Sequence, residues 1–102
     1  MTDLIDMPPA RQVVVPGGGW LTVHEQAGSG PTLVLLHGFT DHALSYRLLL
    51  PHLTGRHVVI PDLRGHGLSG RAPITSLDDF CRDFEAMAAE LRLGTVTLVG
   101  HS

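Results

Sequence analysis

Ser102, in the sequence Gly100-His101-Ser102, is the residue whose type and place most directly suggest chemistry. A serine hydroxyl becomes a strong nucleophile when a neighbouring base takes its proton, and it then attacks acyl carbons to give a covalent intermediate. Ser102 comes soon after residues 95–99, a β-branched and apolar run that predicts a buried strand. Gly100 suits a sharp strand-to-helix turn, because a side chain there would collide across the turn. The pattern indicates a serine nucleophile at a strand end.

Two further motifs stand at the ends of predicted strands. Leu35-Leu36-His37-Gly38-Phe39 closes the apolar run at residues 32–36, and Pro61-Asp62-Leu63-Arg64-Gly65-His66-Gly67-Leu68-Ser69 follows the run at residues 57–60. We interpret His37 as a hydrogen-bonded residue that shapes its turn, with proton transfer by its imidazole as the alternative, and we interpret His101 in the same way. In the later motif, Asp62 and Arg64 are expected to contact each other and pin a glycine-rich loop, so neither is interpreted as catalytic.

The three motifs together resemble those of the α/β-hydrolase family with a serine nucleophile, the AB hydrolase-1 type. Gly100-His101-Ser102 is similar to the first half of the G-x-S-x-G nucleophile elbow, and the other two are similar to the H-G turn and the D-x-R-G-x-G-x-S loop of that family. The resemblance covers residues 13–102. It implies that Ser102 is the nucleophile and that the backbone N–H of Phe39 is one donor of an oxyanion hole.

The elements that must position these residues follow from the hydrophobic pattern. Runs at residues 12–15 and 20–27 flank Pro16-Gly17-Gly18-Gly19 and predict an antiparallel hairpin. Helices are predicted over residues 43–53, with Leu44, Leu48 and Leu49 on one face, and over residues 77–91. The latter is expected to begin at the N-cap Ser76, to end near Gly94 and to carry an apolar stripe that buries Cys81.

The alternation of strands and helices makes the fold class α/β. The resemblance identifies it as the N-terminal part of the α/β-hydrolase fold: an antiparallel hairpin that leads into a mostly parallel sheet, corresponding to the family's strands 1–5, with two helices. Residues 1–11 are expected to be a poorly ordered lead-in, and residues 12–102 a partial domain truncated at the nucleophile elbow. We expect a partial domain because the apolar last strand has no helix after it to cover it.

Composition argues against several other classes of function. Seven basic and ten acidic residues give a net charge of −3 without a Lys/Arg run, so neither nucleic acid nor a membrane surface is an expected partner. A secretory signal and long apolar segments are absent from the sequence, which predicts a cytoplasmic protein. The seven histidines and single cysteine lack metal-site spacing. Residues 65–70 fit G-x-G-x-x-G but do not open a helix, so we expect neither metal nor cofactor.

The resemblance implies a hydrolase that acts on a small-molecule carboxylic ester, thioester or lactone through an acyl-enzyme. In the family's order the triad acid and histidine follow the serine, so residues 1–102 alone are expected to be inactive. Family members that act on epoxides or haloalkanes typically carry Asp at the nucleophile position, and Ser102 argues against those reactions. An acyltransferase and a hydrolase-like receptor for a small ligand remain alternatives, because specificity comes from a cap inserted later in the chain.

Overall fold

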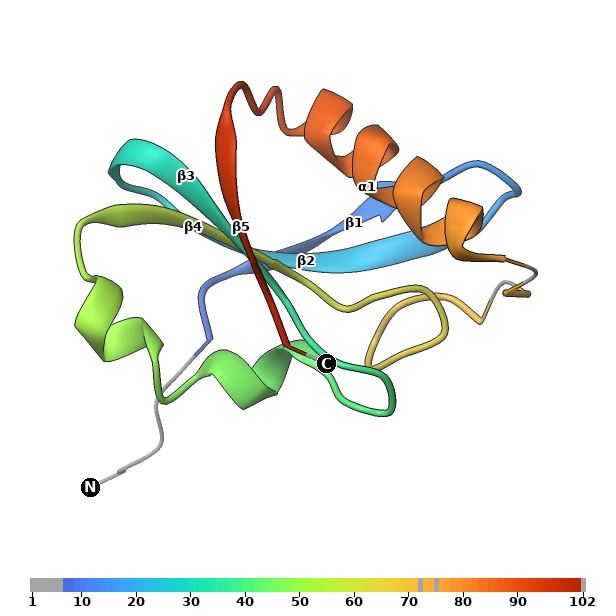
Figure 1. Ribbon diagram of the computed structural model, residues 1–102, viewed down its shortest axis with the longest axis horizontal. Coiled ribbons are helices and arrows are strands. Elements are labelled where there is room, and N and C mark those ends of the chain that lie inside the picture. The colour runs from blue at the N-terminus through green and yellow to red at the C-terminus, as the bar shows by residue number, and fades with distance from the viewer. Residues whose placement is uncertain (1–6, 72, 75, 102) are drawn as a thin grey trace.

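The computed structural model describes residues 7–71, 73–74 and 76–101. A five-stranded sheet with the order β1-β2-β4-β3-β5 forms the middle layer. The helix α1 (Leu77–Glu90) covers one face, and the two 3-10 helices η1 (Ala43–Tyr46) and η2 (Leu50–Leu53) cover the other (Figure 1). None of the helices in these described ranges is long and apolar enough to cross a membrane.

The sheet is antiparallel at one side and parallel at the other. The predicted hairpin is confirmed by β1 (Ala10–Val14) and β2 (Trp20–Gln26), which pair antiparallel, and β2 also pairs antiparallel with β4 (Arg56–Pro61). The strand β3 (Ser29–Leu36) runs parallel to β4 and to β5 (Val96–Gly100). This is the α/β architecture that the sequence predicts. Of the predicted lead-in, residues 1–6 lie outside the described residues, and β1 already includes its last two.

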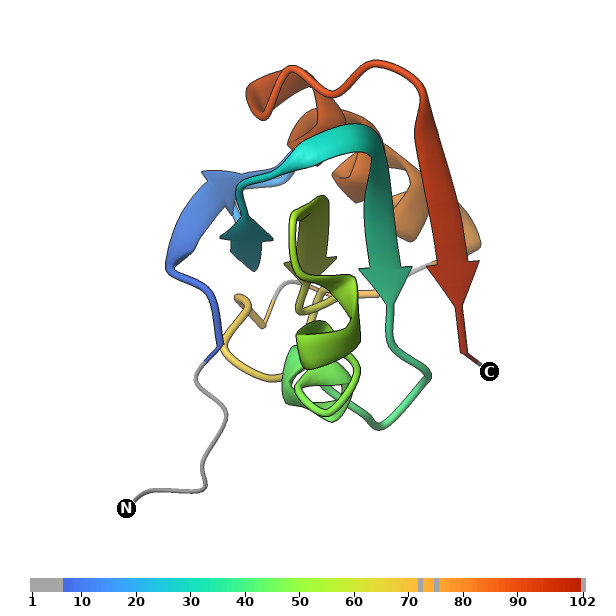
Figure 2. The ribbon, with the colours of Figure 1, turned by 90° about the vertical axis from the view of Figure 1, so that its left-hand side faces the viewer.

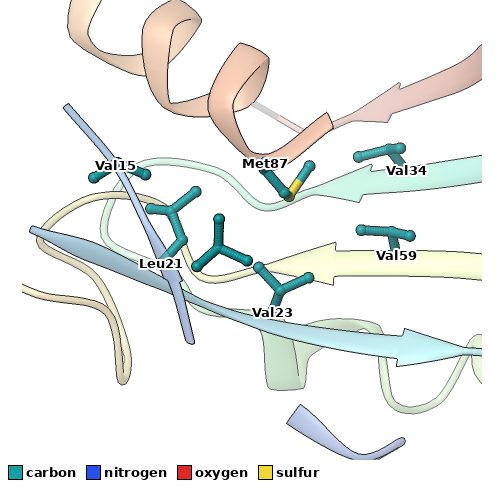
Figure 3. Close-up of a cluster of buried hydrophobic side chains, with 7 residues drawn as sticks. Val15, Leu21, Val23, Val34, Val59 and Met87 are labelled. Atoms are coloured by element: carbon teal, nitrogen blue, oxygen red, sulfur yellow. The ribbon is translucent and has the colours of Figure 1, made fainter. Parts of the chain in front are cut away.

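Successive side chains of a strand point to opposite faces of the sheet, and a hydrophobic core lies on each face. On the α1 face, Val34 of β3 and Val59 of β4 belong to the same buried cluster as Met87 of the helix, whose side chains Figure 3 shows. The next residue of β3, Leu35, faces the opposite side and packs with Ala43 and the 3-10 helices. Burial on both faces explains why β3 and β4 read as almost unbroken apolar runs.

The predicted helix over residues 43–53 is wrong. The chain makes η1 and η2 instead, with i→i+3 bonds such as the one from the Arg47 N–H to the Leu44 carbonyl, at 3.0 Å. Pro51 has no N–H to donate, and its ring would clash with the carbonyl four residues earlier, so an α-helix cannot run through it. The apolar face expected at Leu44, Leu48 and Leu49 is exposed accordingly.

The helix α1 is confirmed at its predicted place, and Phe84, Met87 and Leu91 of its apolar stripe pack against the core, but one edge of the stripe does not. Ser76 caps its start and donates its backbone N–H to Asp79 Oδ2 at 3.2 Å. Cys81 is exposed and Leu77 is 81% exposed, whereas Asp83 and Met87 are buried, so the prediction of a buried Cys81 is wrong. At the end of the helix, Arg92 takes the left-handed conformation, with φ of 55°, that was expected near Gly94.

A buried ion pair explains the orientation of α1. Arg64, in the loop after β4, donates from Nε and Nη2 to the two carboxylate oxygens of Asp83 at 2.9 and 2.8 Å. The side chains of Arg64 and Asp83 are 9% and 3% exposed, and the hydrogen bonds to Asp83 raise the pKa of Arg64. Two buried charges are tolerated only when paired, so the helix must present Asp83 to the loop. The expected contact between Asp62 and Arg64 is therefore wrong.

Replacement of Asp83 by Asn should destabilise the protein by about 3–5 kcal/mol, because Arg64 would stay buried without its hydrogen-bonded counter-charge, and Asp79 is 3.8 Å away. Chemical denaturation of the full-length protein measures this change. Glu85→Gln, at an exposed position of the same helix, is the matched control and should have little effect. Unchanged stability of the Asp83→Asn variant would show that α1 does not depend on the ion pair.

The outer edge of β5 predicts how residues 1–102 behave in isolation. In the described part of the chain β5 pairs only with β3, and its Leu98 is 53% exposed. Unpaired N–H and C=O groups beside apolar side chains favour pairing between chains, so we expect the isolated chain to self-associate.

Light scattering after size exclusion measures this association. Leu98→Lys should reduce it, whereas Leu77→Lys, which removes an exposed leucine from α1, should not. A monomeric sample of the unaltered chain with a cooperative thermal transition would contradict the prediction.

Candidate active site

The three sequence motifs meet at one edge of the sheet. The strands β3, β4 and β5 are parallel, so their carboxyl ends lie together, and Figure 2 shows β3 and β5 ending side by side. Open α/β sheets bind ligands outside the carboxyl ends of their strands. The edge that carries residues 37–42, residues 62–71 and His101 is therefore the candidate active site.

The residue before the predicted nucleophile is hydrogen-bonded to the last residue of β3. The His101 N–H donates to the Leu36 carbonyl at 3.2 Å, and the same carbonyl accepts from the Tyr46 hydroxyl at 2.7 Å. Ser102 itself lies outside the described residues.

A cavity of about 270 Å³ lies between the turn after β3 and the end of β5. The residues that line it come from both segments and from η1: His37, Asp41, Ser45, Tyr46, Val99, Gly100 and His101. Asp41 accepts hydrogen bonds from the Ser45 hydroxyl and the His42 N–H, and these bonds lower the pKa of its carboxyl. An ionised carboxylate thus borders the cavity.

The group of Phe39 that can make a polar contact at the turn is its backbone N–H. Its side chain is 72% exposed and packs edge-on against His66, with ring centroids 5.5 Å apart. Among the described residues, none accepts a hydrogen bond from the Phe39 N–H. An N–H without an internal acceptor can donate to a ligand, as the predicted oxyanion role requires.

His37 is a buried connector between the two loops. Its Nδ1–H donates to the Gly38 carbonyl at 2.7 Å, and its Nε2 accepts from the Leu63 N–H at 2.9 Å. Burial lowers the pKa of His37 and favours the neutral imidazole that these two bonds require. Both nitrogens are occupied, which favours the structural interpretation of His37 over proton transfer.

Asp62 joins the same two loops through backbone groups. Its Oδ1 accepts from the Ala43 N–H at 2.7 Å, and its Oδ2 accepts from the Leu68 N–H at 3.1 Å. A Cβ atom at Gly67 would lie 2.4 Å from the carboxyl carbon of Asp62, so only glycine fits there. The sequence motif identifies this loop, but it does not predict that the N–H groups of Ala43 and Leu68 donate to Asp62.

The sequence analysis did not predict a row of three hydrogen-bonded side chains in the sheet, Glu25, His57 and Thr32. His57 Nε2 lies 2.7 Å from Glu25 Oε2, and its Nδ1 lies 2.7 Å from the Thr32 hydroxyl. These residue types resemble a catalytic triad, but Thr32 is buried within β3 and cannot meet a substrate. The chain of bonds links β2, β4 and β3. A hollow of about 530 Å³ beside Glu25 and Thr54 is lined by none of the residues that follow β3, β4 or β5 at the candidate site.

Comparison with known proteins identifies the family. Residues 31–102 match the family described as alpha/beta hydrolase fold. The chain is 34% identical over 94 residues to the putative hydrolase LipZ of Mycobacterium tuberculosis, covering 83% of this chain and 33% of that protein. It is 38% identical over 85 residues to the 2-(acetamidomethylene)succinate hydrolase of Mesorhizobium japonicum, covering 80% and 30%. The chain thus spans about a third of the length of these relatives.

Solved structures agree with this match. An epoxide hydrolase from an endophytic Streptomyces superposes with a TM-score of 0.80 at 34% identity, covering 92% of this chain and 29% of that one. An E-2-(acetamidomethylene)succinate hydrolase superposes with a TM-score of 0.79 at 33% identity, covering 92% and 35%. The sheet order, the three loops at the carboxyl ends and these matches have one explanation: the chain belongs to the α/β-hydrolase family.

Proposed function

We propose that this chain is the N-terminal part of a serine hydrolase that cleaves carboxylic ester, thioester or lactone bonds through an acyl-enzyme. Residues 12–102 would then form part of a larger domain, which the coverage of about a third of each relative supports. The observation that carries the proposal is that no described residue accepts a hydrogen bond from the Phe39 N–H, in the turn that directly follows Leu36, whose carbonyl accepts from the His101 N–H.

The proposed reaction gives each group one role. Ser102 Oγ bonds to the acyl carbon while its proton passes to a histidine, which the family resemblance places later in the chain. The carbonyl oxygen becomes an oxyanion that accepts from the Phe39 N–H and from the N–H after the serine. The alcohol or thiol then leaves with that proton, and water releases the acid by the same route.

The identity of the nucleophile limits the substrate class. Epoxide hydrolases are among the similar structures, but family members with that activity typically carry Asp where this chain has Ser102. A serine forms an ester with an acyl group, so we propose an acyl substrate. The relative from Mesorhizobium japonicum, a 2-(acetamidomethylene)succinate hydrolase, supports a small molecule. An acyltransferase or a small-ligand receptor with this fold is the alternative.

Replacement of Ser102 by Ala in the full-length protein should lower ester turnover by several orders of magnitude, because the covalent step is lost. Turnover of p-nitrophenyl esters and labelling by a fluorophosphonate probe measure the effect. The control is Ser29→Ala, an exposed serine at the start of β3, which should keep both. Labelling with negligible turnover in the wild type would favour a receptor, and unchanged turnover in Ser102→Ala would refute the proposal.

A further inference from the structure

The turn that carries Phe39 is held in an unfavourable conformation. The Asp41 N–H donates to the Gly38 carbonyl at 3.1 Å, which closes a four-residue turn with Phe39 and Thr40 at its centre. Thr40 has a φ of 67°, the left-handed value that the third position of a type II turn requires and that glycine usually supplies. A β-branched residue in this region is strained, and such strain persists only where neighbouring groups impose it.

His66 supplies the contacts that impose this conformation. Its Nε2 accepts from the Thr40 N–H at 3.4 Å, and its ring packs against the ring of Phe39. The type I alternative has a negative φ at the third position and turns the peptide between Phe39 and Thr40 over, so the Thr40 N–H would point away from His66. The acceptor on His66 therefore favours the observed turn.

His66 is itself anchored on both sides. Its Nδ1–H donates to the Arg64 carbonyl at 2.8 Å, which leaves Nε2 without a proton and able to accept. Arg64 is fixed to α1 through its two hydrogen bonds to Asp83. The His66 ring also packs against His37, with ring centroids 5.1 Å apart. The imidazole is thus a rigid support between the helix and the turn.

We propose that His66 is a positioning residue for the oxyanion turn, which selects the strained conformer and thereby sets the direction of the Phe39 N–H. This inference rests on the proposed function. In this role His66 acts through the turn and not on the reacting atoms, so its effect should fall on kcat and leave KM nearly unchanged. The oxyanion forms only after substrate has bound, which is why a misdirected donor slows the chemical step.

Three substitutions in the full-length protein test this inference. His66→Phe keeps a ring against Phe39 and removes the acceptor, and kcat for a p-nitrophenyl ester should fall about tenfold, a part of the ~10²-fold that loss of an oxyanion donor costs. His66→Gln offers an acceptor oxygen to the Thr40 N–H and should recover most of the rate. His52→Phe, at an exposed histidine of η2, is the control and should match the wild type.

The decisive arm is the double variant of His66→Phe with Thr40→Gly. Glycine adopts positive φ at little cost, so the turn no longer needs His66 to hold it, and kcat should return toward the wild-type value. A support role unrelated to the turn would give no rescue. Wild-type kcat in His66→Phe, or a double variant as slow as His66→Phe alone, would overturn the inference.

A second readout does not depend on turnover. ¹⁵N NMR of the imidazole should show His66 protonated at Nδ1 only, and the Thr40 amide should exchange faster with solvent in His66→Phe than in the wild type. The opposite tautomer or unchanged exchange would also overturn the inference. Absence of Ser102-dependent turnover in the wild type would instead contradict the proposed function, so the two failures are distinguishable.

Discussion

The buried ion pair between Arg64 and Asp83 is the constraint on which the rest of this structure depends. A guanidinium and a carboxylate removed from water must meet each other with good geometry, or the desolvation cost is not recovered. This requirement rotates α1 so that Asp83 faces the loop after β4, and it fixes the backbone of that loop at Arg64. The carbonyl of Arg64 then anchors His66, so a helix on one face of the sheet supports a turn at its carboxyl edge.

The candidate site depends on two further connections between loops that are distant in sequence. Asp62 binds the Ala43 N–H across the gap between the loops after β4 and β3, and His37 binds the Leu63 N–H across the same gap. In each connection a buried polar side chain is hydrogen-bonded to backbone atoms, so the two loops cannot shift relative to each other without leaving a buried polar group unpaired. The Phe39 N–H therefore occupies a defined place relative to the end of β5, as preorganised stabilisation of an oxyanion requires.

The sequence predicted those parts of the fold that depend on local pattern. The hairpin, the buried strands and the extent of α1 follow from hydrophobic periodicity and turn residues, and the structure confirms them. The prediction of one helix over residues 43–53 failed because it relied on the spacing of the leucines and did not consider that Pro51 has no N–H to donate. The prediction that Cys81 is buried failed because the ion pair shifts the buried face of α1 toward Asp79 and Asp83 and leaves Cys81 outside it, and the spacing of these two acidic residues was a signal of this.

For the site, the resemblance implied that the turn with Phe39 and the serine after the last strand act together, and the loop after β4 lies at the same edge because β3, β4 and β5 are parallel. The supports of those loops could not be predicted, because they depend on geometry between residues far apart in the sequence, such as His37 and Leu63 or Thr40 and His66, each 26 positions apart. The most direct test of the account is a crystal structure of the full-length protein after reaction with a phosphonate ester. The account predicts phosphorus bonded to Ser102 Oγ and a phosphonyl oxygen about 2.7–3.1 Å from the Phe39 nitrogen. Phosphorus on another residue, or that oxygen directed away from Phe39, would contradict it.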